Sequence, residues 1–178
     1  MGIFSKLAAL FSEQKEPEAD EERLMIYLSK GIQELDQVNA LSSTLDEHTY
    51  QKPSVRKKLS RRLLQAKIWL EKALEVEQTT RVIDNIIMET FNKGSLRMKI
   101  INSKEVALTN SLHDTTNLIS NTISKLDSLS TVFPDRFYRF IRTIIEMSVS
   151  MTSLKEKLEK LVALEKKVAK VYYEAGGS

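Results

Sequence analysis

A long stretch almost free of helix-breaking residues is the feature that most constrains the fold of this chain. Between Ser54 and Phe133 there is no proline and only one glycine, Gly94. Proline and glycine are the two residues that most disfavour the interior of a helix. The whole chain of 178 residues has 5 glycines and 3 prolines, and 29% of its residues are charged, which is typical of long helices. We therefore predict an all-α fold.

Apolar residues recur at spacings of three and four on both sides of Pro53, which predicts amphipathic helices over 20–47 and 54–93. The repeating positions are Leu24, Leu28, Gly31, Leu35, Val38, Ser42 and Leu45, and then Val55, Leu59, Leu63, Ala66, Leu70, Ala73 and Val76. A second helix of about 40 residues would be roughly 60 Å long, which indicates a helical hairpin or a coiled-coil arm. Because the connection is short, we expect helix 20–47 to fold back along the first half of helix 54–93.

Further helices are predicted after this hairpin. Residues 102–131 are rich in Ser, Thr and Asn, which compete for backbone hydrogen bonds and are poor helix formers. They still carry a helical row of apolar residues, which are Leu112, Ile119, Ile123, Leu126 and Leu129. We expect either a helix that depends on its partners or changes conformation, or an ordinary exposed helix.

The last predicted helix follows Phe133–Pro134–Asp135 and contains KEKLEKLVALEKKVAK, the most coiled-coil-like stretch of the chain. Its apolar row predicts a self-association seam. The seam residues are Phe137, Phe140, Ile144, Met151, Leu154, Leu158 and Leu161. The closing EAGGS ends the helix, so we assign residues 20–175 to a helical core and residues 176–178 to a flexible end.

The opening MGIFSKLAALFS is apolar on one side when it is wound as a helix. Residues on that side are predicted to bind a membrane, and they are Ile3, Phe4, Leu7, Leu10 and Phe11. A helix of this kind lies in the headgroup plane, and no run of about 18 apolar residues predicts a membrane span. We assign residues 1–12 to a membrane-anchor helix and residues 13–19 to an acidic linker, because a charged linker with a proline tethers rather than packs. The alternative is a helix docked on the body of the protein.

The strength of this anchor is limited. Each large apolar side chain contributes at most ~1.5–3 kcal/mol on burial, whereas ordering the backbone costs on the order of 1 kcal/mol per residue. A single anchor is therefore marginal, while many anchors on one assembly bind well through their effective concentration. This balance favours a membrane-binding protein that acts as a polymer.

Charge is distributed unevenly along the chain. Residues 1–50 carry 4 basic and 10 acidic side chains, and residues 51–100 carry 12 and 5. The acidic front and the basic middle are predicted to remain as solvated faces or to meet, within one molecule or between neighbours. The predicted basic surface comprises Lys52, Arg56, Lys57, Lys58, Arg61 and Arg62. Such a cluster fits an anionic membrane, a neighbouring subunit, or nucleic acid, although no aromatic residues interleave it for base stacking.

No catalytic, metal or cofactor site is predicted. There is no cysteine, which excludes disulfides and thiolate chemistry and favours the cytosol. The only histidines are His48 and His113, too few for a metal site, and His113–Asp114 beside Ser111 is not a triad by adjacency alone. The scattered glycines form no phosphate-binding loop. We therefore predict that the protein is not an enzyme.

The order of these features resembles the ESCRT-III family, and most of all its archaeal cell-division branch. The resemblance is carried by MGIFSKL, by LLQAKIWLEKALEVEQTTRVIDNIIMETF and by SLHDTTNLISNTISKLDSLSTVFPDRFYRFIRTI, and it covers residues 1–150. It implies a protein that is closed in solution, opens on membranes and stacks into filaments, in a division ring or a vesicle-budding coat. Paralogous subunits and an AAA ATPase that disassembles the filament are the further partners it implies. It also implies that residues 3–11 insert into the membrane and that Gly94 lies near the hinge of the opening arm.

The sequence thus predicts a membrane-remodelling scaffold subunit that polymerises with itself on anionic membranes, on the cytoplasmic face. Two other functions remain open. A coiled-coil adaptor would bind another protein through helix 137–172. A nucleic-acid-binding protein would use the basic stretch 52–62.

Overall fold

The computed structural model describes residues 19–95, 108, 112, 114–174 and 176. In this part of the chain all regular structure is helical, which confirms the predicted all-α class. The helices are α2 (Asp20–Ser43), α3 (Glu47–Tyr50), α4 (Pro53–Thr80), α5 (Val82–Ser95), α7 (Thr115–Thr131) and α8 (Phe137–Glu174). None of these described helices is both long enough and apolar enough to cross a bilayer.

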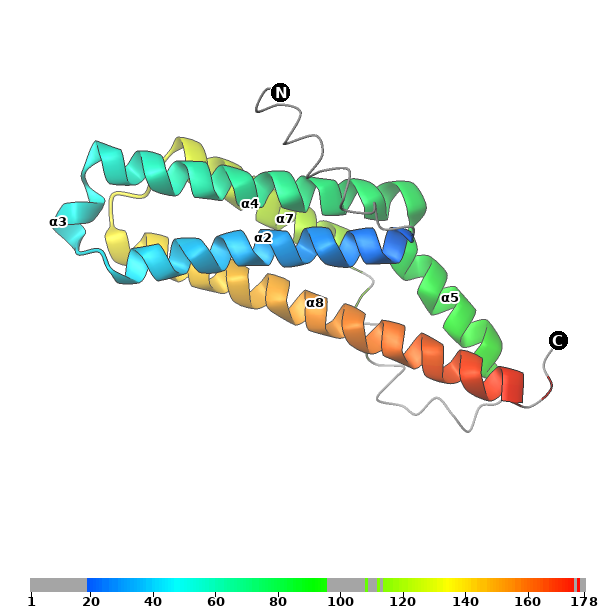
Figure 1. Cartoon of the computed structure of the whole chain (residues 1–178). Helices are drawn as coiled ribbons and strands as arrows, with labels where there is room; N and C mark the ends of the chain where they lie inside the picture. The colour runs from blue at the N-terminus through cyan, green and yellow to red at the C-terminus, as the bar shows by residue number, and fades with distance from the viewer. Residues whose placement is uncertain (1–18, 96–107, 109–111, 113, 175, 177–178) are drawn as a thin grey trace, which may run out of the picture.

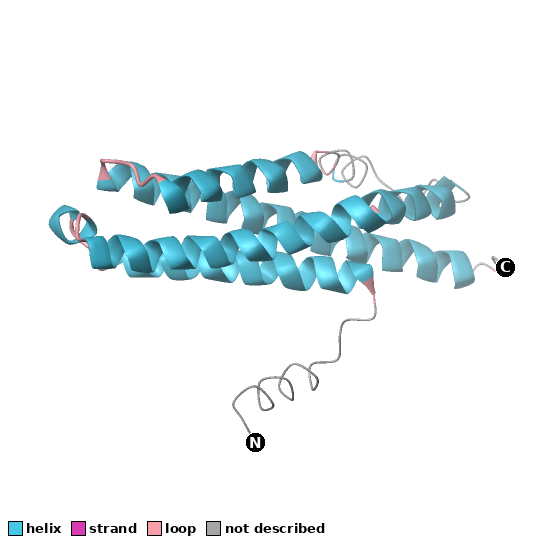
Figure 2. Ribbon diagram, turned by 90° about the horizontal axis from the view of Figure 1, so that it is seen from above, coloured by secondary structure: helices cyan, strands magenta, loops and turns pink. Residues whose placement is uncertain are grey.

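The long helices form an elongated bundle (Figures 1 and 2). Helix α2 packs against α4 and α8, α4 also packs against α7, and α5 packs against the far part of α8. The predicted fold-back of the first helix on the second is therefore present as the α2–α4 pair. Trp69 lies at the edge of this pair, where its ring stacks on Tyr27 at 5.9 Å and the Nζ atoms of Lys30 and Lys72 lie 4.2 and 4.6 Å from its centre.

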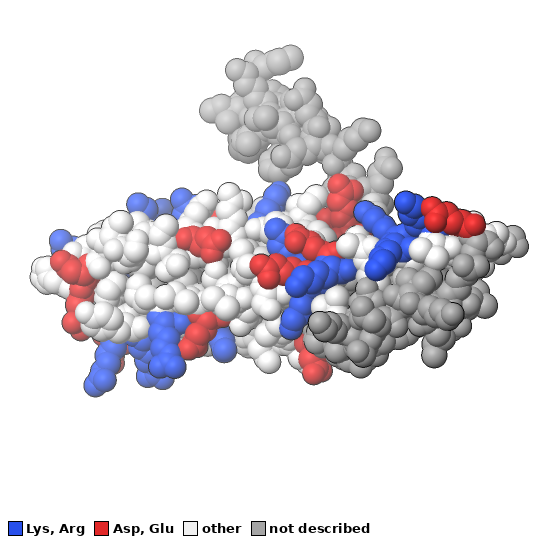
Figure 3. All heavy atoms as spheres, turned by 90° about the horizontal axis from the view of Figure 1, so that it is seen from below, with Lys and Arg blue, Asp and Glu red and all other residues white. Residues whose placement is uncertain are grey.

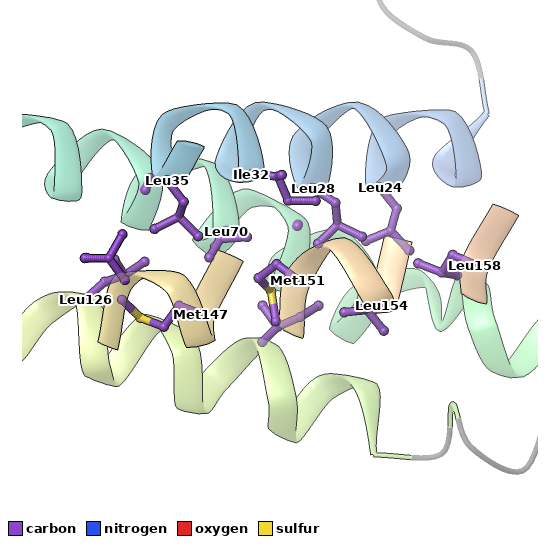
Figure 4. Packing of buried hydrophobic residues seen from close by; sticks show 14 of the residues in the cluster. Leu24, Leu28, Ile32, Leu35, Leu70, Leu126, Met147, Met151, Leu154 and Leu158 are labelled. Carbon is purple, nitrogen blue, oxygen red and sulfur yellow. The ribbon is translucent and has the colours of Figure 1, made fainter. Parts of the chain in front are cut away.

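The core consists of the apolar rows predicted from the sequence. On α2 the buried positions are Leu24, Leu28, Gly31, Ile32, Leu35, Val38 and Ser42. Met147 and Met151 of α8 point between the other long helices, towards Leu28 and Ile32 of α2, Leu70 of α4 and Leu126 of α7 (Figure 4). Each of these side chains contributes roughly 1.5–3 kcal/mol by leaving water.

The first helix ends earlier than predicted. Helix α2 stops at Ser43 rather than at 47, and a turn leads to the short helix α3. Asp46 provides the physical reason, because its carboxylate accepts a hydrogen bond from the Thr49 backbone N–H at 2.6 Å and so starts a new helix. Hydrogen bonding by the Thr49 side chain, and then by its backbone N–H, lowers the pKa of Asp46.

The second predicted helix is broken. The sequence predicts one helix over 54–93, but α4 ends at Thr80 and α5 begins at Val82. Between them Arg81 has φ 46° and ψ 47°, the left-handed conformation, and its N–H bonds to the Glu77 carbonyl at 2.8 Å. The break turns α5 onto α8 and buries Val82, Ile83, Ile86 and Ile87. Burial of this second apolar face offsets the backbone strain at Arg81.

A buried carboxylate accompanies the break. The side chain of Glu77 is buried beneath the α4–α5 junction and accepts a hydrogen bond from the Ile83 N–H at 3.3 Å. Desolvation raises the pKa of Glu77 to about 7; the Ile83 hydrogen bond opposes this shift and the charge of Asp84 adds to it.

Candidate functional site

Three segments that are distant in sequence meet at the end of the bundle where α3 lies. Tyr50 is the centre of this junction, with its ring packed between those of Phe137 and Phe140 at 5.1 and 5.4 Å. Its hydroxyl donates to the Pro134 carbonyl at 3.1 Å, and Gln51 Nε2 donates to the Asp135 carbonyl at 3.1 Å. Burial raises the pKa of Tyr50. The first turns of α4 and α8 are therefore fixed at one end of the molecule.

This junction assembles a basic surface from two stretches of the chain, which we call the basic end. It consists of Lys52, Arg56, Lys57, Lys58 and Arg61 around the start of α4, and of Arg136, Arg139 and Arg142 at the start of α8. All of these side chains are exposed except Arg56, which is half-buried. On the face seen from below, Lys and Arg side chains line one edge at this end, and a second group, mixed with Asp and Glu, lies beyond the middle of the molecule (Figure 3). The carboxylates at the same end are Asp46, Glu47, Asp135 and Glu146.

The basic residues predicted from the sequence divide into two groups. Arg62 is exposed but has partners on α2, because its guanidinium bonds at the surface to Gln37 at 2.6 Å and to Glu34 at 3.4 Å. Arg56 is also engaged, because its guanidinium lies 5.1 Å from the centre of the Tyr50 ring and its Nε donates to the Tyr50 carbonyl. Among the described residues, the other four predicted basic side chains have no ion-pair partner. They are Lys52, Lys57, Lys58 and Arg61.

The three arginines of α8 were not among the basic residues predicted from the sequence. They lie in RFYRFIR, where Phe137 and Phe140 are buried and the arginines alternate with them on the outer side. Arg142 has a partner in Glu146, but both side chains of this 2.9 Å pair are largely exposed, so the pair adds little. A periodicity search for charged residues would have found this helix face. Only the fold shows that it joins the start of α4.

The basic end also has apolar features and a hollow. Arg136, Tyr138, Arg139, Arg142 and Glu47 surround an open hollow of about 660 Å³. Tyr138 is 76% exposed and Val132, in the preceding loop, is 75% exposed. Guanidinium groups bind phosphate oxygens in a two-pronged geometry, and tyrosine is favoured at membrane interfaces. This arrangement suits an anionic, phosphate-bearing surface better than a small-molecule substrate.

Comparison of this chain with protein-family models, with curated proteins and with solved structures found no match.

The acidic first turn of α2, at Asp20, Glu21 and Glu22, lies away from the basic end. Asp20 and Glu21 stand beside Thr80 and Val82, at the junction of α4 and α5, while α2 runs for 24 residues, or about 36 Å, before it reaches the basic end. Within one molecule the acidic front and the basic middle therefore meet at the ion pair between Arg62 and Glu34 at 3.4 Å. The carboxylates in the first turn of α2 do not reach the basic end in the part of the chain that the structure describes. A meeting between neighbouring molecules stays a prediction.

The predicted membrane-binding, hinge and seam residues lie in different parts of the chain, and only some of them are described by the structure. The membrane-binding residues of segment 3–11, and His113, lie outside the described residues. Gly94 lies in the helical backbone of α5, whereas the interruption of the arm is at Arg81. All seven seam residues, from Phe137 to Leu161, are buried in the core of their own chain. In this conformation the seam is occupied and is not free to bind a second copy.

No alternative chemistry emerges from the described residues. His48 is exposed on α3, and among the described residues no group of histidine and carboxylate side chains is arranged to hold a metal ion. Glu77 is the described residue whose pKa departs furthest from its usual value, and it lies under a helix junction rather than in a pocket. The surface chemistry of the basic end is therefore the best candidate for function.

Proposed function

We propose that this protein is a scaffold subunit that binds anionic membranes peripherally and polymerises on them to remodel them, as its resemblance to ESCRT-III implies. The observation that carries this proposal is the basic end, where the fold joins two basic stretches beside exposed Tyr138 and Val132. Basic side chains near an anionic bilayer contribute roughly 1 kcal/mol each. Several unpaired charges on one surface would supplement the marginal anchor predicted for residues 3–11.

The geometry of the bundle suggests how it would lie on a membrane. Segment 3–11 is joined to α2 at Asp20, at the opposite end of α2 from the basic end. The linker 13–19 can extend over about 23 Å, which is less than the length of about 36 Å for α2. Both elements reach one flat membrane if the long axis of the bundle lies along the surface. Molecules lying flat would present their sides to neighbours, which is the arrangement that a filament needs.

The occupied seam bears on the adaptor alternative. A coiled-coil adaptor that uses 137–172 needs the apolar face of α8, and that face packs against α2 and α5 in this structure. Polymerisation through the same seam would require α8 to leave the bundle. The exposed basic end, in contrast, is available without any rearrangement, and this favours the surface-binding function over the adaptor.

The test is co-flotation of the full chain with vesicles of phosphatidylserine and phosphatidylcholine, with electron microscopy of the same samples. Lys57→Glu/Arg61→Glu removes exposed charge from the basic end without touching the core. At about 1 kcal/mol per charge, the double reversal should weaken binding to anionic vesicles at least about thirty-fold. The matched control is Lys160→Glu/Lys166→Glu, which makes the same charge change on an exposed part of α8 far from the basic end.

Three results would contradict the proposal. The first is equal flotation of the two double variants, which would mean that net charge rather than the basic end drives binding. The second is unchanged flotation after deletion of residues 1–12. The third is an absence of filaments on vesicles that carry the wild-type protein. Salt-sensitive binding to DNA or RNA without flotation would support the nucleic-acid alternative instead.

A further inference from the structure

The bundle has one seam that its own described helices do not close. Around the core, α2 packs on α4, α4 packs on α7 and α2 packs on α8, but α7 and α8 contact each other only sparsely although one short loop joins them. Two hollows lie along this seam. The outer surface between α7 and α8 is therefore a groove, which we call the α7–α8 groove.

The groove runs along the middle of both helices. One hollow of about 580 Å³ lies near the loop, between Leu129 and Val132 on one side and Arg139 and Thr143 on the other. The second hollow, of about 420 Å³, lies between Leu118 of α7 and Val149, Ser153 and Lys157 of α8. From Arg139 to Lys157 the groove follows 18 residues of α8, or about 27 Å.

The apolar, small and charged side chains that line the groove indicate what kind of segment can bind in it. Apolar side chains on its margins are left in solvent, with Leu118 36%, Val149 63% and Val132 75% exposed. Small Ser and Thr side chains on its walls leave room for larger groups from outside. Three basic residues stand along it, namely Lys125, Arg139 and Lys157, against the two carboxylates Asp114 and Asp135, so the lining is basic on balance. The complementary occupant is a short apolar helix that is joined to acidic residues.

The chain itself contains such a segment. Residues 3–11 carry the apolar face, and the adjoining linker carries Glu13, Glu16 and Glu18. A helix of twelve residues is about 18 Å long, which fits within the groove. The apolar face of residues 3–11 is favoured to be buried from water, and the exposed apolar side chains along the groove can bury it.

The segment is also within reach. The hydrogen bond between Ser148 Oγ and Asp36 Oδ1 aligns α8 with α2, and Asp20 shares a hollow with Glu165 of α8. Ser153 is therefore about 18 Å along α8 from the start of α2. The linker 13–19 extends over about 23 Å, so residues 1–12 can enter the groove at the Lys157 end of the same molecule.

We infer that the apolar face of residues 3–11 docks in the α7–α8 groove of its own chain when no membrane is present. The docked helix occupies the position of a fifth helix in the bundle, with its apolar residues over Leu118 and Val149 and its acidic linker near Lys157. The regulatory consequence rests on the proposed function: the groove and the membrane compete for the same apolar face, so the anchor is sheltered in solution and released at a bilayer.

The experiment uses crosslinking between engineered cysteines, since the natural chain has none. Ser5→Cys is combined with Ser153→Cys in the groove, and the full-length protein is treated with a short bismaleimide in buffer without lipid. The control pair is Ser5→Cys with Gln33→Cys. Gln33 is exposed on α2 at about the same level of the bundle as Ser153, but on a different face. Docking predicts an intramolecular crosslink at least ten times faster for the groove pair.

Two substitutions on α8 sharpen the comparison. Val149→Asp places a charge at the margin of the groove and should abolish the rate difference. Ile145→Asp places the same charge one helical turn away, at an exposed position that lines neither hollow, and should leave the rate difference unchanged. Both side chains are exposed, so both variants should fold, and circular dichroism of each variant is the check.

Two outcomes overturn the inference. Equal rates for the two cysteine pairs would show a tether without a docking site. Crosslinked dimers in place of crosslinked monomers would show that the occupant is the segment of a second copy. The assay contains no membrane, so its result is independent of flotation: selective crosslinking with no vesicle binding would leave the docking intact and remove the proposed function alone.

Discussion

Gly31 on α2 faces Leu70 on α4 so closely that a β-carbon at position 31 would lie 2.8 Å from Leu70 Cδ2. Both residues are buried, and the Ala66 carbonyl oxygen is also near, at 3.7 Å from the same position. The missing side chain lets the two helices of the hairpin approach each other. A glycine in a helix interior normally costs about 1 kcal/mol relative to alanine, and here close packing compensates for that cost.

The first prediction concerns this contact. Gly31→Ala should fail to give the usual gain of about 1 kcal/mol, because overpacking costs about 1–3 kcal/mol. Leu70→Ala alone should cost about 2–5 kcal/mol through the cavity it leaves. In the double variant the new methyl group occupies part of that cavity, so the pair should cost less than the sum of the single changes. Urea unfolding followed by circular dichroism measures all three, and stabilisation by Gly31→Ala alone would contradict the close contact.

The second prediction concerns pH. The pKa of Glu77 is raised to about 7 in the folded protein from the ordinary glutamate value of 4.5. Between these two pH values the folded state therefore holds a proton that the unfolded state has lost. The free energy of unfolding should therefore fall as pH rises from about 4.5 to 7, by up to about 3 kcal/mol. Glu77→Gln should remove this dependence and raise stability at pH 8, while changing it little at pH 4.

The measurement is a series of urea titrations from pH 4 to pH 8 on the wild type and on Glu77→Gln. A suitable control is Glu75→Gln, because Glu75 is an exposed carboxylate two residues away on the same helix. If both variants retain the pH dependence of the wild type, Glu77 is not the group that titrates.

The third prediction concerns the junction of α4 and α5. Arg81 is the only non-glycine residue with positive φ in the described part of the chain, and a left-handed conformation costs a residue with a β-carbon about 1–2 kcal/mol. Arg81→Gly should raise the free energy of unfolding by about 1 kcal/mol, because glycine adopts this conformation without strain. Gln78→Gly, at an exposed helical position three residues earlier, should lower it by a similar amount. The same sign for both variants would mean that the chain at Arg81 is helical in solution.

The buried faces of the helices could be predicted from the sequence, whereas the break between α4 and α5 could not. The 3–4 spacing on α2 and α4 identified the buried faces, because burial along a helix follows its period of 3.6 residues. The break at Arg81 was missed because it contains neither glycine nor proline, although the apolar row shifts between Val76 and Ile83. That conformation is set by the packing of α5 on α8, a contact between residues distant in sequence.

One part of the basic end could likewise be predicted from the sequence and the other part could not. The cluster at the start of α4 was visible as a run of Lys and Arg, yet two of its members have partners in the same molecule. Arg56 is half-buried against Tyr50, and Arg62 stays exposed while it bonds to Gln37. The matching arginines of α8 belong to a different run, and only the contacts of Tyr50 with Pro134 and Phe137 place them at the same end. A sequence pattern reports which residues share a helix face, whereas the joining of two faces depends on tertiary contacts.

The last prediction concerns the bond that holds α8 to α2. Ser148, which is buried on α8, donates its hydroxyl to the Asp36 carboxylate at 2.6 Å. A hydrogen bond to a charged group contributes about 1.5–3 kcal/mol, so Ser148→Ala should loosen α8 by about that amount. If the buried seam is the self-association surface, this change should raise the population of molecules with α8 released by roughly ten-fold or more. Light scattering over a concentration series should then show stronger association for Ser148→Ala than for the wild type. Ser153→Ala, an exposed change on the same helix, should have no such effect. Weaker stability without any gain in association would mean that subunits assemble through another surface, with α8 kept in the bundle.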